Sequence, residues 1–155
     1  MGMGISETRR KRIWYGLTAT VTLGPRYLHR AGFDRMVFPH PPVVNWLLRI
    51  GVSDEAKRRL VFAHEFAHFE TAPAAILYMG ALFAFIYSRG RFSLASILMA
   101  VVSTHAAWEM LAEGLVVLES PADYRQSYNS LPQLPRILFW LLGTVLAVAG
   151  WIAAI

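Results

Sequence analysis

The sequence contains no cysteine in its 155 residues. Disulfides, thiolate metal sites and a cysteine nucleophile are therefore excluded, and any metal ion must be held by histidine, aspartate or glutamate. Charged residues are also scarce: they make up 16% of the chain, against 55% hydrophobic residues and a mean hydropathy of +0.41. This composition is too apolar for an ordinary soluble domain and predicts an integral membrane protein.

Positive charge is concentrated towards the N-terminus. The formal net charge is +5, and eleven of the fifteen lysines and arginines precede position 60. Because they are interspersed with prolines, aromatic residues and short apolar runs, we interpret them as topology determinants and expect no nucleic-acid partner. The positive-inside rule then places the N-terminus on the cytoplasmic side, and we expect the inner or plasma membrane of a bacterium or archaeon.

Four segments differ in hydropathy. Residues 1–59 form a basic membrane-surface region, in which residues 13–24 are apolar for too few positions to span a bilayer and predict an interfacial or half-inserted helix. Residues 60–118 contain two long apolar stretches joined by a short polar turn, which predict a transmembrane helical hairpin. Residues 119–135 predict a polar loop, and residues 136–155 a C-terminal transmembrane helix. The expected fold is an all-α integral membrane protein, a small bundle of three transmembrane helices plus the N-terminal interfacial or half-inserted helical region.

A five-residue string in the first long apolar stretch, His64-Glu65-Phe66-Ala67-His68, reads HExxH. On a helix, residues four apart lie on one face, so His64 and His68 can bind one metal ion. Glu65 lies beside them, where it can act as general base towards a metal-bound water. In lipid, two histidines and a carboxylate are costly unless a bound ion compensates for their desolvation. We therefore predict a metal site; the alternative is a pair of hydrogen-bonded histidines packed in the bundle.

The second apolar stretch carries a polar stripe of its own. His105, Glu109 and Glu113 follow one another at i, i+4 spacing and share one helix face. At about 1.5 Å per residue from the turn at Gly90, the two glutamates lie roughly 29 to 35 Å along their helix, and the HExxH histidines roughly 33 to 39 Å along theirs. The two sets should meet at the end of the hairpin opposite the turn. The third ligand could be Glu109, Glu113 or His105, and His105 could instead stabilise an oxyanion.

An HExxH helix followed at a distance by a helix with Glu-x-x-x-Glu resembles the gluzincin class of zinc metallopeptidases, most closely the membrane-embedded CAAX-processing and HtpX-like peptidases. The matching residues are the HExxH string and Trp108–Gly114, about a tenth of the chain. The resemblance implies that Glu65 is the general base, and that Glu113 stands where the family usually has an acid that hydrogen-bonds a ligand histidine. No edge strand for an extended substrate is evident, short segments within residues 26–59 being the only candidates. The zinc ligands that the resemblance implies are His64, His68 and Glu109.

Three functions fit these residues. The first is a membrane-embedded zinc hydrolase, foremost a metallopeptidase that cuts a membrane protein or peptide, with Glu65 passing a proton from water to the leaving amine. The second is a non-haem iron or di-metal oxidase, with Fe or Mn, acting on a lipid or quinone, because Glu65-x-x-His68 also has the spacing of di-iron carboxylate bundles. The third is a non-enzymatic small subunit or assembly factor of a membrane complex. Expected partners are membrane lipids, a peptide or protein substrate, and further copies of the chain or a larger complex.

Overall fold

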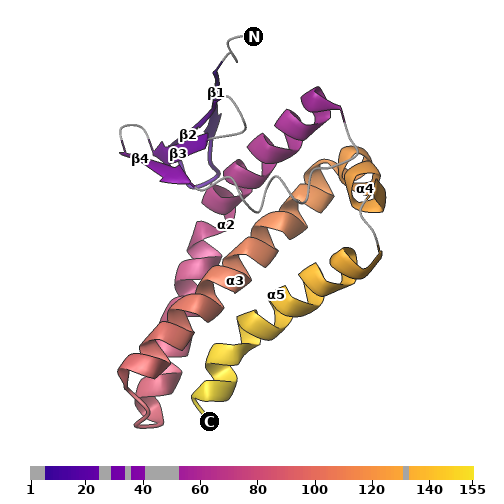
Figure 1. Cartoon of the computed structure of the whole chain (residues 1–155). Helices are drawn as coiled ribbons and strands as arrows, with labels where there is room; N and C mark the ends of the chain where they lie inside the picture. The colour runs from indigo at the N-terminus through magenta and orange to yellow at the C-terminus, as the bar shows by residue number, and fades with distance from the viewer. Residues whose placement is uncertain (1–5, 25–28, 34–35, 41–52, 131–132) are drawn as a thin grey trace.

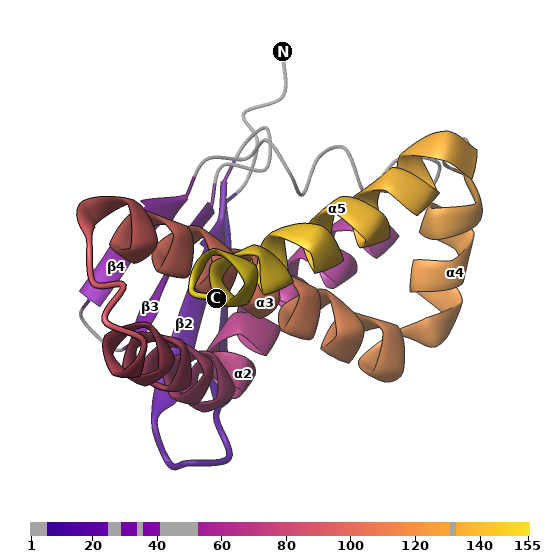
Figure 2. The ribbon, with the colours of Figure 1, turned by 90° about the horizontal axis from the view of Figure 1, so that it is seen from below.

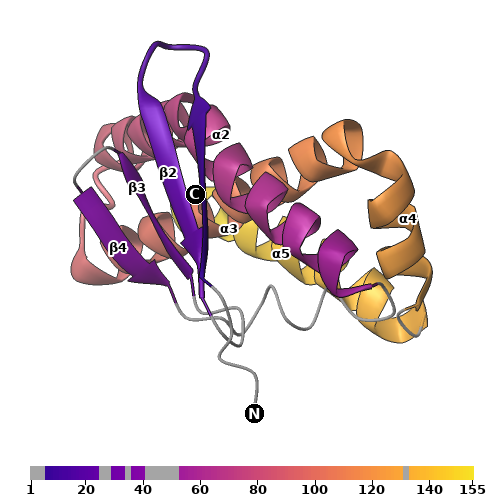
Figure 3. The same ribbon diagram turned by 90° about the horizontal axis from the view of Figure 1, so that it is seen from above.

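A computed structural model describes residues 6–24, 29–33, 36–40, 53–130 and 133–155 of the chain. Within these ranges the chain forms four strands followed by four helices (Figure 1). The sheet lies against one side of the N-terminal half of the first helix, and the shortest helix lies on the other side of the molecule (Figure 3). In the described part of the chain, one end of the molecule thus contains both strands and helices, and the other end contains helices alone.

The helices account for most of the described chain. α2 (Asp54–Ser88) and α3 (Leu94–Glu119) form an antiparallel hairpin, and α5 (Gln133–Ala153) packs along α3 (Figure 2). α2 and α3 are long and apolar enough to cross a membrane, whereas α5 contributes a shorter apolar segment. Of the three predicted transmembrane helices, two are therefore long and apolar enough to span a membrane. Ser53 begins α2, its side chain accepting a hydrogen bond from the backbone of Ala56, as expected of an N-cap.

The N-terminal region is a β-sheet, so the expected all-α fold and the interfacial helix at residues 13–24 are wrong. The strands form an antiparallel meander in the order β1-β2-β3-β4. Residues 18–23 read Thr-Ala-Thr-Val-Thr-Leu, a period of two that is typical of a half-buried strand and that a search for long apolar runs overlooks. The strand bounds are β1 (Glu7–Arg12), β2 (Thr18–Leu23), β3 (His29–Phe33) and β4 (Met36–His40).

The polar segment between the second and third long helices also differs from the prediction. Residues 119–135, expected to form a loop, contain the helix α4 (Pro121–Ser130). Proline is tolerated in the first turn of a helix because its missing N–H would have no intrahelical partner there. α4 is tied to α2 by Arg59, whose guanidinium makes two hydrogen bonds to the carboxylate of Asp123.

The buried face of β2 packs on the N-terminal half of α2. Alternate residues of the strand point inwards, and they meet aromatic and aliphatic side chains within and just before the HExxH string. This cluster holds the sheet against the helix segment that carries the two histidines. Its buried members are Ile13, Ala19, Val21, Leu23, Val61, Phe62 and Phe66.

α5 approaches the α2–α3 hairpin closely at Gly150. A Cβ at this position would lie 2.7 Å from Leu82 Cδ2 and 2.9 Å from Ser103 Cβ, so only glycine fits. Close to this contact, the hydroxyls of Tyr78 and Ser103 donate to the backbone carbonyl of Ala147. Close packing at small residues and interhelical hydrogen bonds of this kind hold apolar helices together in lipid, where the hydrophobic effect does not drive helices to associate.

A proline within α2 leaves one backbone carbonyl without its helical donor. In an α-helix the N–H of residue i donates to the carbonyl of residue i−4, and Pro73 has no N–H, so the carbonyl of Phe69 lacks this bond. The Tyr15 hydroxyl donates to that carbonyl at 2.6 Å. The turn between β1 and β2 therefore supplies the hydrogen bond that the helix cannot make for itself.

The carbonyls on either side of Phe69 also accept hydrogen bonds from side chains. Trp14 Nε1 donates to the carbonyl of Glu70 at 3.0 Å, and Trp108 Nε1 donates to the carbonyl of His68 at 2.9 Å. The first donor comes from the β1–β2 turn and the second from α3. Three consecutive carbonyls, beginning with that of the last residue of the HExxH string, thus connect the sheet and α3 to the same stretch of α2.

Candidate metal centre

The two histidines of the HExxH string face each other across one turn of α2. The Nε2 atoms of His64 and His68 lie 3.0 Å apart, and the two rings meet nearly at right angles. His64 is buried and His68 is half-buried. The i, i+4 spacing thus directs both Nε2 atoms to the same point beside the helix.

A carboxylate from the neighbouring helix completes the group. The side chain of Glu109 on α3 lies between the histidines, with one oxygen 3.3 Å from His64 Nε2 and the other 3.4 Å from His68 Nε2. One ligand atom from each of the three residues lies within 4.8 Å of the others, so this cluster could hold a metal ion. Glu109 is more than forty positions from the two histidines in the sequence. The hairpin of α2 and α3 brings them together.

The distances within the group fit a small tetrahedral cation. Zinc binds histidine nitrogens and carboxylate oxygens at about 2.0–2.2 Å, so two ligand atoms at the tetrahedral angle stand roughly 3.3–3.5 Å apart. One oxygen of Glu109 lies 3.3 Å from His64 Nε2 and the other oxygen lies 3.4 Å from His68 Nε2, both close to this value, and the Nε2–Nε2 distance of 3.0 Å is slightly shorter. Three protein ligands leave a fourth position for water or a substrate oxygen, as in catalytic zinc sites.

Glu113 supports the group from behind and does not join it. Its carboxylate lies 2.9 Å from His64 Nδ1, and its side chain is 1% exposed. Since a carboxylate accepts, the Nδ1–H of His64 donates to it, which directs the Nε2 lone pair towards the metal position. Of the predicted third ligands, Glu109 therefore faces both histidines, and Glu113 orients one of them.

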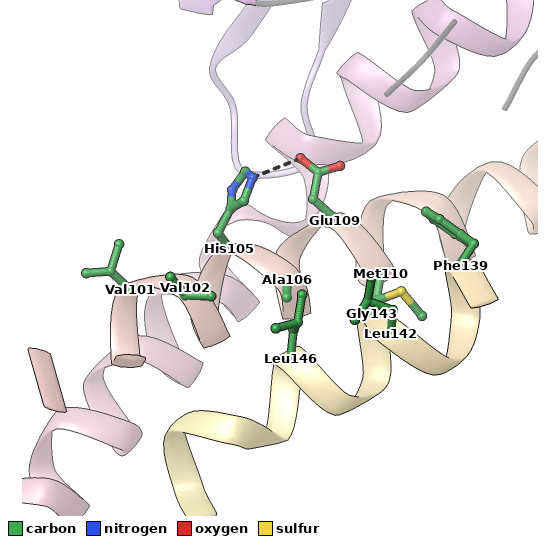
Figure 4. Close-up of a pocket in the computed structure, with 10 residues that line it drawn as sticks. All are labelled: Val101, Val102, His105, Ala106, Glu109, Met110, Phe139, Leu142, Gly143 and Leu146. Carbon is green, nitrogen blue, oxygen red and sulfur yellow. Dashed lines mark ion pairs between the residues drawn. The ribbon is translucent and has the colours of Figure 1, made fainter. Parts of the chain in front are cut away.

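The two predicted catalytic residues occupy different environments. Glu65 is buried, and its carboxylate lies close enough to His64 to act on that ring electrostatically. His105 lies at the outer rim, 70% exposed, with its Nε2 3.6 Å from a carboxylate oxygen of Glu109 (Figure 4). His105 is thus near the candidate metal position without belonging to the three-residue group, and its ring is accessible from outside.

Ion pairs surround the same end of the molecule. Lys11 of β1 lies 2.6 Å from Glu70 of α2 and 3.3 Å from Glu119 of α3. Burial disfavours the charged form of Lys11, but these two carboxylates outweigh it, so the pKa of Lys11 is raised above its ordinary 10.5. Burial, reinforced by the negative charge of Glu70, raises the pKa of the Tyr15 hydroxyl above 10.0.

Apart from Glu113, sequence reasoning did not find the residues that hold the centre in place. Pro73 within a helical stretch was a usable signal, because it predicts a carbonyl in need of a donor four residues earlier. Nothing in the sequence indicates that the donor is Tyr15, or that Trp108 contacts the His68 ring, 5.1 Å away, while bonding the His68 carbonyl. Such contacts depend on tertiary structure, and no local pattern encodes them.

Comparison of the chain with protein-family models, curated proteins and solved structures finds no match.

Proposed function

We propose that the chain is a membrane-embedded, zinc-dependent hydrolase, foremost a metallopeptidase. The observation that supports this most directly is the arrangement of His64, His68 and Glu109 at zinc-ligand spacing, with Glu113 on the far nitrogen of His64. Two neutral imidazoles and one carboxylate match the ligand set of open, catalytic zinc sites.

Each residue then has a definite task. A zinc ion held by His64, His68 and Glu109 would supply a Lewis acid that polarises a carbonyl and lowers the pKa of water to about 7. Glu65 takes a proton from the attacking water and passes it to the leaving amine as the carbon–nitrogen bond breaks. Glu113 keeps His64 in the tautomer that binds metal. His105, at the rim, donates to the oxygen of the attacked carbonyl as negative charge develops there.

The distribution of charge supports a position at the membrane surface. Residues 71–88 of α2 contain no Asp, Glu, Lys or Arg, and neither do residues 94–108 of α3 or residues 137–155. At about 1.5 Å per residue the α2 segment spans roughly 27 Å, close to the ~30 Å thickness of the hydrocarbon layer. The metal centre begins within one turn of its end. We therefore place three spans in the membrane, with the centre, the sheet and the ion pairs at the cytoplasmic surface.

An edge strand close to the centre supports a peptide substrate. β1 is the first strand of the sheet and pairs only with β2 among the described strands. It is joined to α2 through Lys11 and Glu70, two residues beyond His68. An extended peptide can add to an exposed sheet edge through backbone hydrogen bonds, which would present its carbonyls to the metal position.

The di-metal alternative has less support. It requires further carboxylates facing a second ion, but Glu113 bonds the outer nitrogen of His64 and Glu70 is paired with Lys11. Both side chains are thus engaged away from the shared ligand position. One metal ion per chain is what the arrangement accommodates.

Metal analysis of the purified chain tests the proposal. About one zinc per chain should survive Glu65→Gln, because that residue binds no metal, whereas His68→Ala and Glu109→Ala should lose it. Hydrolysis of a membrane peptide library should disappear in all three variants. Full zinc content in His68→Ala would contradict the ligand assignment, and unchanged hydrolysis in Glu65→Gln would contradict the role of the base.

A further inference from the structure

A groove between α3 and α5 begins at the metal centre. It has a volume of about 440 Å³, and Glu109 and His105 form its polar rim (Figure 4). Apart from these two, its lining is apolar or glycine. Glu109 therefore contacts both the histidines of the centre and the groove, so the groove is continuous with the site. The remaining lining residues are Val101, Val102, Ala106, Met110, Phe139, Leu142, Gly143 and Leu146.

The groove descends from the centre into the part of the molecule that we place in the membrane. Val101 lies eight residues before Glu109 on α3, which is about 12 Å along the helix towards the turn. Val102 and Leu142, on opposite walls, are 45% and 58% exposed, so the groove is open along its side. A molecule could therefore enter laterally from the lipid layer, with its polar end reaching the metal position.

We propose that this groove holds the single alkyl chain of an acylated substrate whose scissile amide lies at the metal centre. The inference rests on the proposed hydrolase function and names its substrate class, a peptide acylated at its N-terminus, whose amine is the leaving group. A methylene needs about the 30 Å³ of a water molecule, so the groove takes one chain of about a dozen carbons. A transmembrane helix, ~10–12 Å across with its side chains, is far too wide. The lining contains no lysine or arginine, so it offers nothing to a phosphate group.

The reaction follows from this placement. The oxygen of water bonds to the amide carbon, the carbon–nitrogen bond breaks, and the proton taken by Glu65 goes to the leaving nitrogen. The products are a fatty acid, whose chain remains in the groove, and a free amine that leaves into water. No oxidant or other co-reactant is needed.

Alkyl hydroxamates of different chain length test the groove independently of turnover. A hydroxamate binds an open metal position with two oxygens, and binding changes the visible absorption of the Co²⁺-substituted protein. We expect acetohydroxamate to bind the wild-type chain and the groove-filling variants Val102→Trp and Ala106→Phe equally. Dodecanohydroxamate should bind both variants at least about tenfold more weakly than the wild-type chain, because each buried methylene contributes up to roughly fourfold in affinity.

Leu111→Trp is the matched control. Leu111 is 42% exposed, close to the 45% of Val102, but lies nine residues further along α3, which is two and a half turns and hence the opposite face. Partitioning of dodecanohydroxamate into detergent is the same in the measurements on all four proteins. The ratio of a variant's affinity to the wild-type affinity therefore reports on the groove alone. Equal dodecanohydroxamate affinities in all four would overturn the groove assignment and leave the metal centre intact.

A second measurement separates this inference from the proposed function. If acetohydroxamate changes the Co²⁺ spectrum of none of the proteins, the open metal position is refuted and the hydrolase proposal fails. A dodecanamide with a diazirine at its chain end then tests the groove without metal. Cross-linking to Val101 or Leu146 that is lost in Val102→Trp supports a chain-binding groove. Cross-linking elsewhere, or to a second copy of the chain, overturns it.

Discussion

The carboxylate of Glu113 shows how much a single residue outside the ligand set determines. It is buried, accepts a hydrogen bond from the Nδ1 side of His64, and is separated from the candidate metal position by the imidazole ring. An isolated buried carboxylate would be strongly destabilising, so its partner is essential. The Nδ1–H of His64 satisfies the carboxylate, and the carboxylate fixes the ring in return.

Replacing Glu113 should therefore weaken metal binding without removing a ligand. We expect Glu113→Ala to lower zinc affinity by about 10- to 100-fold, as for other carboxylates that orient ligand histidines. Competition with a chelator of known affinity measures this. Glu55→Ala serves as the control because Glu55 is an exposed carboxylate at the start of the same helix. Unchanged affinity in Glu113→Ala would show that the ring is oriented by other contacts.

At the scale of elements, α2 depends on the sheet for one of its own hydrogen bonds. Tyr15 donates to the carbonyl that Pro73 leaves without a donor. This connects a turn near the start of the chain to the middle of a helix more than fifty residues later. The sheet therefore completes the hydrogen bonding of the helix that carries the candidate metal ligands, in addition to covering it.

A double-mutant cycle tests this dependence. Tyr15→Phe should lower the free energy of unfolding by about 1–2 kcal/mol, because it leaves a half-buried carbonyl without a donor. In a Pro73→Ala background the helix regains its own N–H, so Tyr15→Phe should be nearly neutral. Urea unfolding of the four proteins in the same detergent gives the coupling. Equal effects in both backgrounds would mean that the hydroxyl does not substitute for the missing N–H.

The proposed placement of α2 in the membrane predicts where along the hairpin a charged residue is tolerated. Leu77 and Leu118 are similarly exposed, at 74% and 77%, but only Leu77 lies in the stretch without charges. Leu77→Lys should impair membrane insertion by about 2.5–3.5 kcal/mol, the usual effect of lysine at the centre of a span. Leu118→Lys should be tolerated. Membrane fractionation and a translocon insertion assay measure the difference, and equal insertion of both variants would remove the basis for this span.

The elements differ in how far the sequence could predict them. The hairpin followed from two long apolar stretches and a glycine turn, and counting along both arms predicted that Glu109 and the HExxH histidines would meet. The sheet was missed because β2 alternates threonine with small aliphatic residues, which lowers the overall hydropathy while keeping one face apolar. α4 was missed because prolines and polar residues mark a loop as readily as a short surface helix.

At the scale of the whole molecule, Lys11 links three elements at one end. Its ammonium group pairs with Glu70 on α2 and Glu119 on α3, while its backbone belongs to β1. Positive and negative charges from distant parts of the chain meet here. The lower part of the hairpin, by contrast, is joined by apolar contacts and a few hydrogen bonds.

These charges give the molecule a pH dependence on the alkaline side. Folding raises the pKa of Lys11 above 10.5 and the pKa of Tyr15 above 10.0. Their stabilising contributions are therefore complete below about pH 10 and are lost as the pH rises through the folded-state pKa values. The melting temperature should fall as the pH rises from about 10 to about 11.5, and it should fall less in a Lys11→Met, Tyr15→Phe double variant. The same fall in both proteins would assign the effect to other groups.

The division of the candidate ligands between two helices has a thermodynamic consequence. A cation held by His64 and His68 on one side and Glu109 on the other acts as a removable cross-link between the arms of the hairpin. If it binds the folded chain alone, a free concentration of one hundred times the dissociation constant adds about 2.7 kcal/mol to the free energy of unfolding. The melting temperature of the protein would then rise and fall with the concentration of free zinc. The lifetime of each folded copy in the cell would therefore depend on the zinc supply.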